Sequence, residues 1–483
     1  MTKDYTENYH RVTKIKNNFL LINDIGDWAL LTKENYHRFL TGKLTEKKYS
    51  YLEKSNIIIT KRNIQKIIND TREYYAYLFR ATSRHRIITC GTCNNRCAYC
   101  YASPQLFENK LMMSRKTAKK VIDLIFKFPE KTITIEFHGG ECLLNFEIIK
   151  FIVAEVTKLN KRFKRKITYS LTTNLSILTQ EMVDFFKKYK FICVSSLDGP
   201  KALHDQQRKS CSGEGTYENI IKNLKLAESN GLNFDFITTI TKNSLKYHEE
   251  IVDEFVKINK KYFFLRPVKR KGFANDNWES TSCLPEEYFD FWKKYLDILI
   301  KKTSQGELMD DNLVCILLKK IIFNNRVNYM PLRNPCGLSS IMTYNYNGDI
   351  IPCCENRDEI MKIGNVNSTS WVDIVSSQKL SCLINKTLLE NHACDMCAYK
   401  PYCGICLNNN YDPSRKRFRV GQDKMICDLY KMQFNYLFEK ILFDKDAREI
   451  FKKWLLYNPK TKQEMKDINF RECFVQFEKE IRK

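Results

Sequence analysis

Between residues 86 and 268, short apolar runs alternate with longer stretches in which apolar residues recur every three or four positions. The short runs are rich in β-branched and aromatic residues, as strands are, and the longer ones have the period of amphipathic helices. Six strands separated by helices predict an α/β fold with a parallel sheet or partial barrel. The expected strands are 86–89, 132–137, 166–174, 191–198, 234–241 and 262–268, and the expected helices are 114–128, 147–161, 179–189, 216–229 and 247–259.

The segments on either side of this pattern are organised differently. In residues 1–80, apolar runs at 19–24 and 28–32 predict two strands, followed by helices near 36–40 and 45–54 and a strand at 56–60. This order predicts a small winged-helix-like module. We therefore divide the chain into an N-terminal module (1–80), a barrel (81–283), a helical linker (284–335), a loop-rich cysteine segment (336–427) and a helical tail (428–483).

Composition narrows the class of protein. Hydrophobic residues make up 43% of the 483 residues, which supports a large core and excludes a disordered or fibrous chain. No apolar run approaches the length of a membrane span, and the N-terminus lacks a signal peptide, so we expect a cytoplasmic protein without a membrane partner. The net charge is +24, but lysines are dispersed along the whole chain. That dispersion argues against a nucleic-acid partner.

Cysteine is the informative residue type. The chain has 19 cysteines, and in a cytoplasmic protein clustered cysteines indicate metal or redox chemistry rather than disulfides. The segment 336–427 shows little periodic pattern and cannot build an ordinary core, so we expect metal to staple it. Most of the scattered cysteines are predicted to be ordinary buried thiols.

A C-x-x-x-C-x-x-C motif follows the first strand of the barrel. It consists of Cys93, Cys97 and Cys100. Three thiolates in one loop hold three irons of a cubane and leave the fourth iron open. A zinc knuckle is the alternative, but it needs a fourth protein ligand, which only Cys90 at the strand end could supply.

Polar motifs stand at the ends of the following strands, where parallel sheets carry their active sites. Gly139, Gly140 and Glu141 end the second strand, and Asn174 ends the third. Ser196 and Asp198 end the fourth strand and Arg208 follows them.

Together with the cysteine loop, these residues resemble the radical S-adenosylmethionine (SAM) superfamily. The resemblance implies a partial (β/α)6 TIM-like barrel and a [4Fe-4S] cluster on Cys93, Cys97 and Cys100, whose open iron chelates SAM. It also implies that Tyr99 contacts adenine and that Arg208 pairs with the SAM carboxylate. The remaining implied SAM contacts are Gly139, Gly140, Glu141, Asn174, Ser196 and Asp198, with Glu141 or a carbonyl accepting from the ammonium group.

The later cysteines resemble the SPASM auxiliary-cluster domain of the same superfamily. By resemblance, one auxiliary [4Fe-4S] cluster is held by Cys394, Cys397, Cys403 and Cys427, and a second by Cys336, Cys353 and Cys406. Cys403 and Cys406 are separated by two residues, where the family usually has three. The fourth ligand of the second cluster is left open between Cys315, Cys354 and no protein ligand. A zinc ribbon on 394, 397, 403 and 406 is the alternative.

The whole arrangement resembles radical SAM/SPASM peptide maturases, with finer similarity to those of His-Xaa-Ser peptide systems at 23–28, 264–274 and 334–337. The resemblance implies a 5′-deoxyadenosyl radical that oxidises or cross-links residues of a ribosomal precursor peptide. It also implies an electron donor such as flavodoxin or ferredoxin, and a paired maturase is a further candidate partner. Residues 1–80 would grip the peptide by strand addition, or would form a cap on the barrel.

Two alternatives belong to other functions. A sulfatase maturase has an Asp directly after the cysteine corresponding to Cys353, where it serves as a base, whereas this chain has Cys354. Glu355 or Asp358 would then have to substitute. A non-catalytic, metal-stapled binding module is the other alternative.

Overall fold

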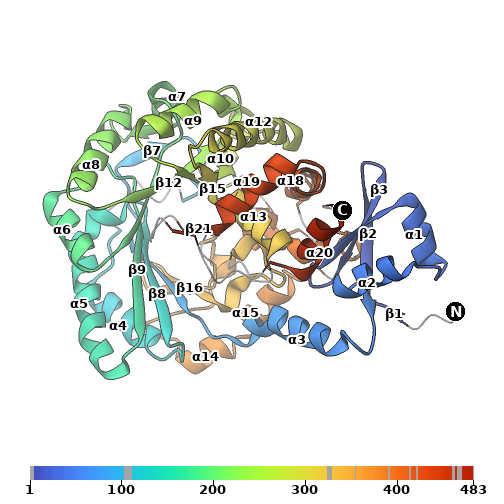
Figure 1. Cartoon of the computed structure of the whole chain (residues 1–483). Coiled ribbons are helices and arrows are strands. Elements are labelled where there is room, and N and C mark those ends of the chain that lie inside the picture. Colours follow the sequence, from blue (N-terminus) through green and yellow to red (C-terminus); the bar gives the residue numbers. More distant parts are fainter. Residues whose placement is uncertain are drawn as a thin grey trace.

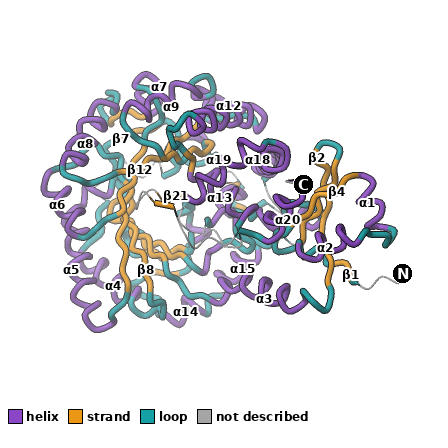
Figure 2. Tube along the Cα trace, in the orientation of Figure 1, coloured by secondary structure: helices purple, strands orange, loops and turns teal. Residues whose placement is uncertain are grey.

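The computed structural model describes residues 5–102, 111–323, 329–353, 355–389, 392–412, 415–419, 423–458, 463–464 and 470–481. The alternating segment forms a curved sheet with helices on its outer face (Figures 1 and 2). Neighbouring strands of this segment pair in parallel, which confirms the predicted α/β fold. The strands are β6 (Arg84–Cys90), β8 (Thr132–Gly139), β9 (Lys166–Thr172), β10 (Ile192–Ser196), β12 (Phe234–Ile240) and β14 (Leu265–Pro267).

The outer helices lie close to the predicted ranges. They begin where the sequence offers caps: the Ser114 hydroxyl accepts from Thr117 N–H at 3.1 Å, and the Thr179 hydroxyl accepts from Met182 N–H at 3.3 Å. These helices are α4 (Arg115–Ile125), α5 (Phe146–Phe163), α6 (Gln180–Lys188), α8 (Tyr217–Ser229) and α9 (His248–Lys257).

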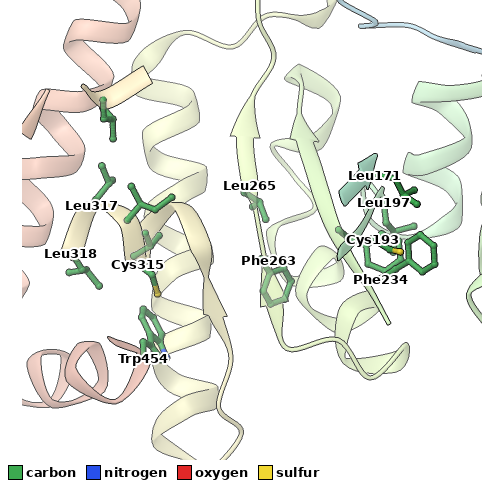
Figure 3. Close-up of a cluster of buried hydrophobic side chains, with 14 of the residues drawn as sticks. Leu171, Cys193, Leu197, Phe234, Phe263, Leu265, Cys315, Leu317, Leu318 and Trp454 are labelled. Carbon is green, nitrogen blue, oxygen red and sulfur yellow. The ribbon is translucent and has the colours of Figure 1, made fainter. Parts of the chain in front are cut away.

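Alternation along the strands separates two environments. On β8, Ile133, Ile135 and Phe137 are fully buried and belong to one core with α4 and α5, whereas Glu136 and His138 between them keep partial exposure. Figure 3 shows the same core further along the sheet, where Cys193 and Phe234 pack together. The outer face of the sheet is therefore apolar and its concave face is polar.

The last predicted strand, 262–268, is divided. Its first half is β13 (Tyr262–Phe263), which pairs with β15 (Asp310–Asp311), and only β14 joins the main sheet. Asp311 accounts for the division, because its carboxylate accepts from Leu265 N–H at 2.9 Å and also from the first turn of α13 (Asn312–Ile322).

The main sheet does not stop at β6. It continues with β16 (Ile341–Tyr344), which runs parallel to β6, and then with the antiparallel β17 (Asp349–Ile351) and β18 (Gly364–Asn365). The turn between β16 and β17 uses Gly348 at a φ of 90°, which favours glycine. Part of the segment expected to be loop-rich is thus built into the same nine-stranded sheet.

The N-terminal module has a three-stranded antiparallel sheet in the order β2 (His10–Ile15), β3 (Asn18–Asn23) and β4 (Trp28–Thr32). The predicted strands correspond to β3 and β4, and β2 was missed because its residues alternate with Lys, Arg and His. Three helices and a short strand follow: α1 (Lys33–Leu40), α2 (Glu46–Lys54), β5 (Ile58–Ile59) and α3 (Ile64–Tyr75).

This module packs against C-terminal elements, in particular α18 (Lys424–Phe443) and α20 (Glu472–Ile481) (Figure 1). The Trp28 ring meets Phe438 and Phe477, and its indole N–H donates to Ile321 O at 3.1 Å. Asp27 is paired with Arg471 at 2.9 Å, both nearly fully buried. The described helices include none with the length and apolar run needed to cross a membrane.

Candidate functional site

The loop that follows β6 brings three thiols together. Its centre is β7 (Asn95–Cys97), which pairs antiparallel with β11 (Arg208–Ser210). Burial, followed by Glu141 and by the thiols of Cys97 and Cys100, raises the pKa of Cys93. Burial likewise raises the pKa of Cys97 to about 12, against the opposing effect of Arg208. Thiols must lose their protons to bind a metal, so a bound metal would favour the thiolate form of Cys93 and Cys97 against this burial.

Cys90 stands apart from this group. It is fully buried, and its sulfur lies 3.2 Å from both Thr92 N and Thr92 O. Across the described residues, no three His, Cys, Asp or Glu side chains are arranged to hold a single metal ion. The Cys90 thiol is thus engaged with Thr92, which disfavours a zinc knuckle completed by Cys90.

The Gly-Gly-Glu element supports the cysteine loop through its backbone. A Cβ on Gly139 would come within 2.6 Å of Cys90 O, so only glycine fits there. Gly140 N–H donates to Cys90 O at 2.8 Å and Glu141 N–H donates to Thr92 O at 2.9 Å. The Gly-Gly-Glu element therefore fixes the path of the backbone from Cys90 to Thr92, directly before the cysteine motif.

The Glu141 carboxylate is fully buried and already has its partners. It accepts from Leu143 N–H at 2.9 Å, Asn174 N–H at 2.6 Å and the Thr173 hydroxyl at 2.7 Å. Burial raises the pKa of Glu141, and these hydrogen bonds oppose the rise. The carboxylate thus ties the ends of β8 and β9 together.

Arg208, Asp198 and Tyr99 form a buried triad beside Cys97. Arg208 Nε donates to Asp198 Oδ2 at 2.9 Å, and the Tyr99 hydroxyl donates to the same oxygen. The guanidinium lies over the Tyr99 ring at 5.2 Å, and its Nη1 is 3.9 Å from Cys97 Sγ. Burial disfavours the charge of Arg208, but Asp198 outweighs it and raises the pKa. A permanent cation therefore adjoins the thiols.

The other predicted contacts lie around this triad. Asn174 Nδ2 donates to Asn94 Oδ1 at 2.8 Å and approaches Cys93 Sγ at 3.8 Å. Ser196 ends β10 and is partly exposed. The Tyr99 ring packs with Val268 and Ala274, an apolar surface of the kind that an adenine ring contacts.

Cys336, Cys353 and Cys406 line one small cavity together with Glu355 and apolar side chains. Cys315 is elsewhere, on α13: its thiol bonds to Asp310, and Figure 3 shows it near Trp454. Of the three options for a fourth ligand, the structure thus disfavours Cys315. Cys354 lies outside the described residues.

A second group of thiols surrounds Cys403. Burial raises the pKa of Cys403 to about 12, and the thiols of Cys397, Cys427 and Cys394 act in the same direction. Cys427 comes from α18, whereas the others come from the loop around residues 394–403. The groups expected from the sequence therefore gather as two separate sets.

Sequence reasoning did not find the charged side chains on the concave face of the sheet. Arg86 and His138 lie on neighbouring strands, and Arg266 and Arg357 come from distant segments. The strand alternation in β6 and β8 could have located Arg86 and His138. An isolated arginine in an irregular segment carries no such signal.

A parallel β/α sheet with three thiols at its strand ends, and further thiol groups in an appended segment, defines an iron–sulfur enzyme of the SAM-cleaving kind. Comparison with known families agrees. The chain matches the radical SAM superfamily over residues 87–255 and an iron–sulfur cluster-binding domain, SPASM, over residues 336–399. The chain belongs to the radical SAM superfamily and is an enzyme with a SPASM domain. The first domain binds a [4Fe-4S] cluster with SAM, and the second binds auxiliary iron–sulfur clusters.

Individual relatives have low sequence identity to this chain, but the similarity extends over most of its length. A cysteine-type anaerobic sulfatase-maturating enzyme of Clostridium novyi is 24% identical over 73% of this chain and 94% of its own length. The radical SAM cyclopropyl synthase TigE of Paramaledivibacter caminithermalis is 24% identical, over 74% of each chain.

Solved structures show the same fold. The structure of anSMEcpe with bound AdoMet has a TM-score of 0.66 at 20% identity and covers 77% of this chain and 99% of its own. SuiB of Streptococcus suis bound to its precursor peptide SuiA has a TM-score of 0.54 at 16% identity, over 88% of this chain and 99% of its own.

Proposed function

We propose that this enzyme reductively cleaves SAM and modifies a ribosomally made peptide by oxidising or cross-linking its residues. The observation that carries the proposal is that the cysteines gather into three separate groups. One group lies at the strand ends of the barrel, and the other two lie in the SPASM segment. Cys93, Cys97 and Cys100 would hold the SAM-binding cluster. Cys394, Cys397, Cys403 and Cys427 would hold one auxiliary cluster, and Cys336, Cys353 and Cys406 the other.

Once bound, the cluster and SAM would supply a 5′-deoxyadenosyl radical able to abstract a hydrogen atom from the peptide. The protein residues position the reactants. Arg208 stays charged beside Cys97 and faces the site of the SAM carboxylate, while Asp198 and Tyr99 hold it in place. Asn174 and Ser196 line the same strand ends, and Gly139 and Gly140 meet Cys90 O at the end of β8, so they shape the loop that would receive SAM.

The relatives support a peptide or protein as the substrate, because one matures sulfatases and SuiB was solved with a precursor peptide. The N-terminal module offers a place for such a peptide. Strand addition there is limited to the outer edges of β2 and β4, because β3 is central and β5 is already paired with Thr6–Glu7; on β4, Leu30 N–H already donates to the Tyr51 hydroxyl at 3.0 Å.

A groove between the module and the SPASM segment is the better candidate for peptide binding. Tyr75 and Leu78 line one side, at and just beyond the end of α3, and Pro335 and Leu388 line the other. Among the residues described for α3, none is buried, although its apolar residues recur at helical spacing. We infer that an apolar segment of the precursor peptide lies in this groove.

A sulfatase-type maturase remains the second candidate, because several relatives carry that name. A sulfatase-type maturase needs a carboxylate base, and neither Glu355 nor Asp358 is well suited to that role. Glu355 is paired with Lys269 and lies 3.5 Å from Arg266, and these cations outweigh its burial and lower its pKa to about 2. Asp358 lies 3.5 Å from Lys271. A carboxylate held ionised by two cations is a weak base.

The experiment combines the anaerobically purified enzyme, dithionite and SAM with each short peptide that the neighbouring genes are found to encode. We expect 5′-deoxyadenosine and a peptide lighter by two hydrogens in the mass spectrum. A methylated peptide, or no peptide modification despite SAM cleavage, would contradict the proposal. A sulfatase-derived cysteine peptide serves as the comparison, because its conversion to an aldehyde, detected with a hydrazide, would support the second candidate. Flavodoxin or ferredoxin in place of dithionite tests the proposed electron donor.

A further inference from the structure

Basic side chains gather on the concave face of the sheet, beside the cysteine loop. Arg86 lies on β6, Arg266 on β14 and Arg357 in the loop after β17, so strands from opposite parts of the sheet contribute. All three surround His138, the residue before Gly139. Burial and these three guanidinium groups together hold the pKa of His138 well below its usual range, so His138 adds no charge.

The carboxylates on this face are already shared. Glu136 lies 2.9 Å from Arg86 and 3.2 Å from Arg84, and Glu355 is shared by Lys269 and Arg266. This face thus carries two carboxylates and five cations, which are Arg84, Arg86, Arg266, Lys269 and Arg357. Such an excess of one charge attracts a ligand of the opposite charge.

Arg357 is the cation left over. Among the described residues it forms no ion pair: its guanidinium lies over the Tyr101 ring at 5.7 Å, and its Nη2 is 3.5 Å from the Tyr101 hydroxyl. Its Nε is buried and has no hydrogen-bond partner. A buried donor without an acceptor is costly, so the position is suited to an acceptor that arrives from outside.

A ligand could reach this place. Arg266 keeps 28% of its side chain exposed, Glu355 19% and Arg86 14%, although strands of the sheet surround them. The surroundings of Arg357 also adjoin the cysteine loop that would hold the SAM-binding cluster. Tyr101 follows Cys100 directly, and His138 is joined to the glycines that contact the cysteine loop.

We propose that the substrate peptide carries an Asp or Glu side chain at or beside the reacting residue, and that Arg357 receives this carboxylate. The planar guanidinium offers two parallel N–H donors to a carboxylate, and Arg266 and Arg86 add favourable charge around it. The proposal rests on the proposed function, because it assumes a peptide in this face of the sheet. It adds the chemical class of that peptide.

A rival explanation is that these cations only offset the negative charge of an auxiliary cluster, since Arg357 is four residues from Cys353. The two explanations differ in what a substitution changes. If Arg357 binds substrate, its loss alters peptide selection and leaves the cluster spectra as they are. If it balances a cluster, its loss alters iron content or the reduction potential of that cluster and leaves peptide selection unchanged.

The experiment uses the full-length enzyme with its clusters and SAM, and two libraries of random dodecapeptides. The central position is Asp or Glu in one library and Asn or Gln in the other. Peptides that remain bound to the enzyme are counted by affinity selection and mass spectrometry. We expect at least about a tenfold enrichment of the acidic library, because desolvated charge pairs in protein interfaces contribute this much or more.

Arg357→Gln should abolish the enrichment and Arg357→Lys should retain part of it, while exposed Arg38→Gln, a matched control on α1, should retain all of it. Iron content and cluster electron paramagnetic resonance spectra should match the parent. Equal binding of both libraries by the parent, no binding of either, or enrichment that survives Arg357→Gln would overturn the proposal. If Arg357→Gln does not fold, the parent and Arg357→Lys decide. Peptide modification without an acidic preference would refute this inference and leave the proposed function standing.

Discussion

The loop of Cys93, Cys97 and Cys100 and the cysteines of segment 336–427 carry the same side chain but are supported in opposite ways. The loop is supported by protein: Gly140 and Glu141 donate backbone hydrogen bonds to it, and β7 pairs with β11. In the later segment, Cys336 and Cys353 are themselves part of a small apolar core. The comparison teaches that backbone hydrogen bonds from neighbouring strands position the first site, whereas packing of its thiols in a small apolar core positions part of the second.

The sharpest test replaces all three loop cysteines by alanine. Formation of 5′-deoxyadenosine should fall to background, because the cluster that chelates SAM is lost. Relative to the cluster-free parent, the free energy of unfolding should change by only about 1 kcal/mol per substitution, since the loop keeps its backbone bonds. Product analysis and chemical denaturation of the anaerobic protein measure both. Continued 5′-deoxyadenosine formation would show that the cluster is held elsewhere.

The matching change in the later segment replaces Cys394, Cys397, Cys403 and Cys427. Peptide product should disappear while SAM cleavage continues, because the electron left after hydrogen abstraction loses its acceptor. Hydrogen–deuterium exchange should rise across 392–427 and stay low in β6 and β8. Normal product from this variant, or unchanged exchange in that segment, would break the comparison.

Asp198→Asn tests whether protein contacts alone support the first site. It leaves Arg208 buried without its counter-charge, and we expect a loss of about 3 kcal/mol in the free energy of unfolding, with weaker SAM binding. Asp123→Asn, at the exposed pair with Lys119, is the control and should cost less than about 1 kcal/mol. Similar losses in both variants would mean that the buried triad has no special role.

The buried acid pair Asp310 and Asp311 makes the stability of the barrel side depend on pH. Burial first, and then Asp311, raises the pKa of Asp310 to about 7. The folded state therefore binds more protons than the unfolded state above pH 4, so stability falls as the pH rises towards 7. Asp310→Asn should increase the free energy of unfolding by about 2 kcal/mol at pH 5.5 and by little at pH 4. Exposed Asp290→Asn is the control, and a gain that does not depend on pH would contradict this account.

The smallest effect concerns the groove beside α3. Tyr75→Ser with Leu78→Ser should weaken binding of the precursor peptide about fivefold, because both side chains line the groove and are partly exposed. Val372→Ser, at an exposed apolar position outside the groove, should not. Point variants are preferable to deletion of 1–80, because Trp28 and Asp27 are buried against the C-terminal helices. Unchanged affinity would favour a purely structural role for the module.

Strong periodicity made the barrel predictable. Five helices and six strands follow from runs long enough to show their period. β16 was missed because it spans four residues, and the β7–β11 ribbon because three residues per strand give no alternation. At the site, spacing located the cysteines, but no pattern shows that the Glu141 carboxylate is already used or that Arg357 lies beside Tyr101. Such facts depend on long-range contacts.

The pairing of β16 with β6 has a consequence for anyone who divides this protein. A chain ended at residue 335 would turn β6 into an edge strand, with a row of unpaired backbone donors and acceptors along Arg84–Ile87. Exposed, flat edges recruit strands from other molecules. The isolated barrel is therefore expected to form inclusion bodies. In the whole protein, β16 of the auxiliary segment covers this edge and so opposes aggregation.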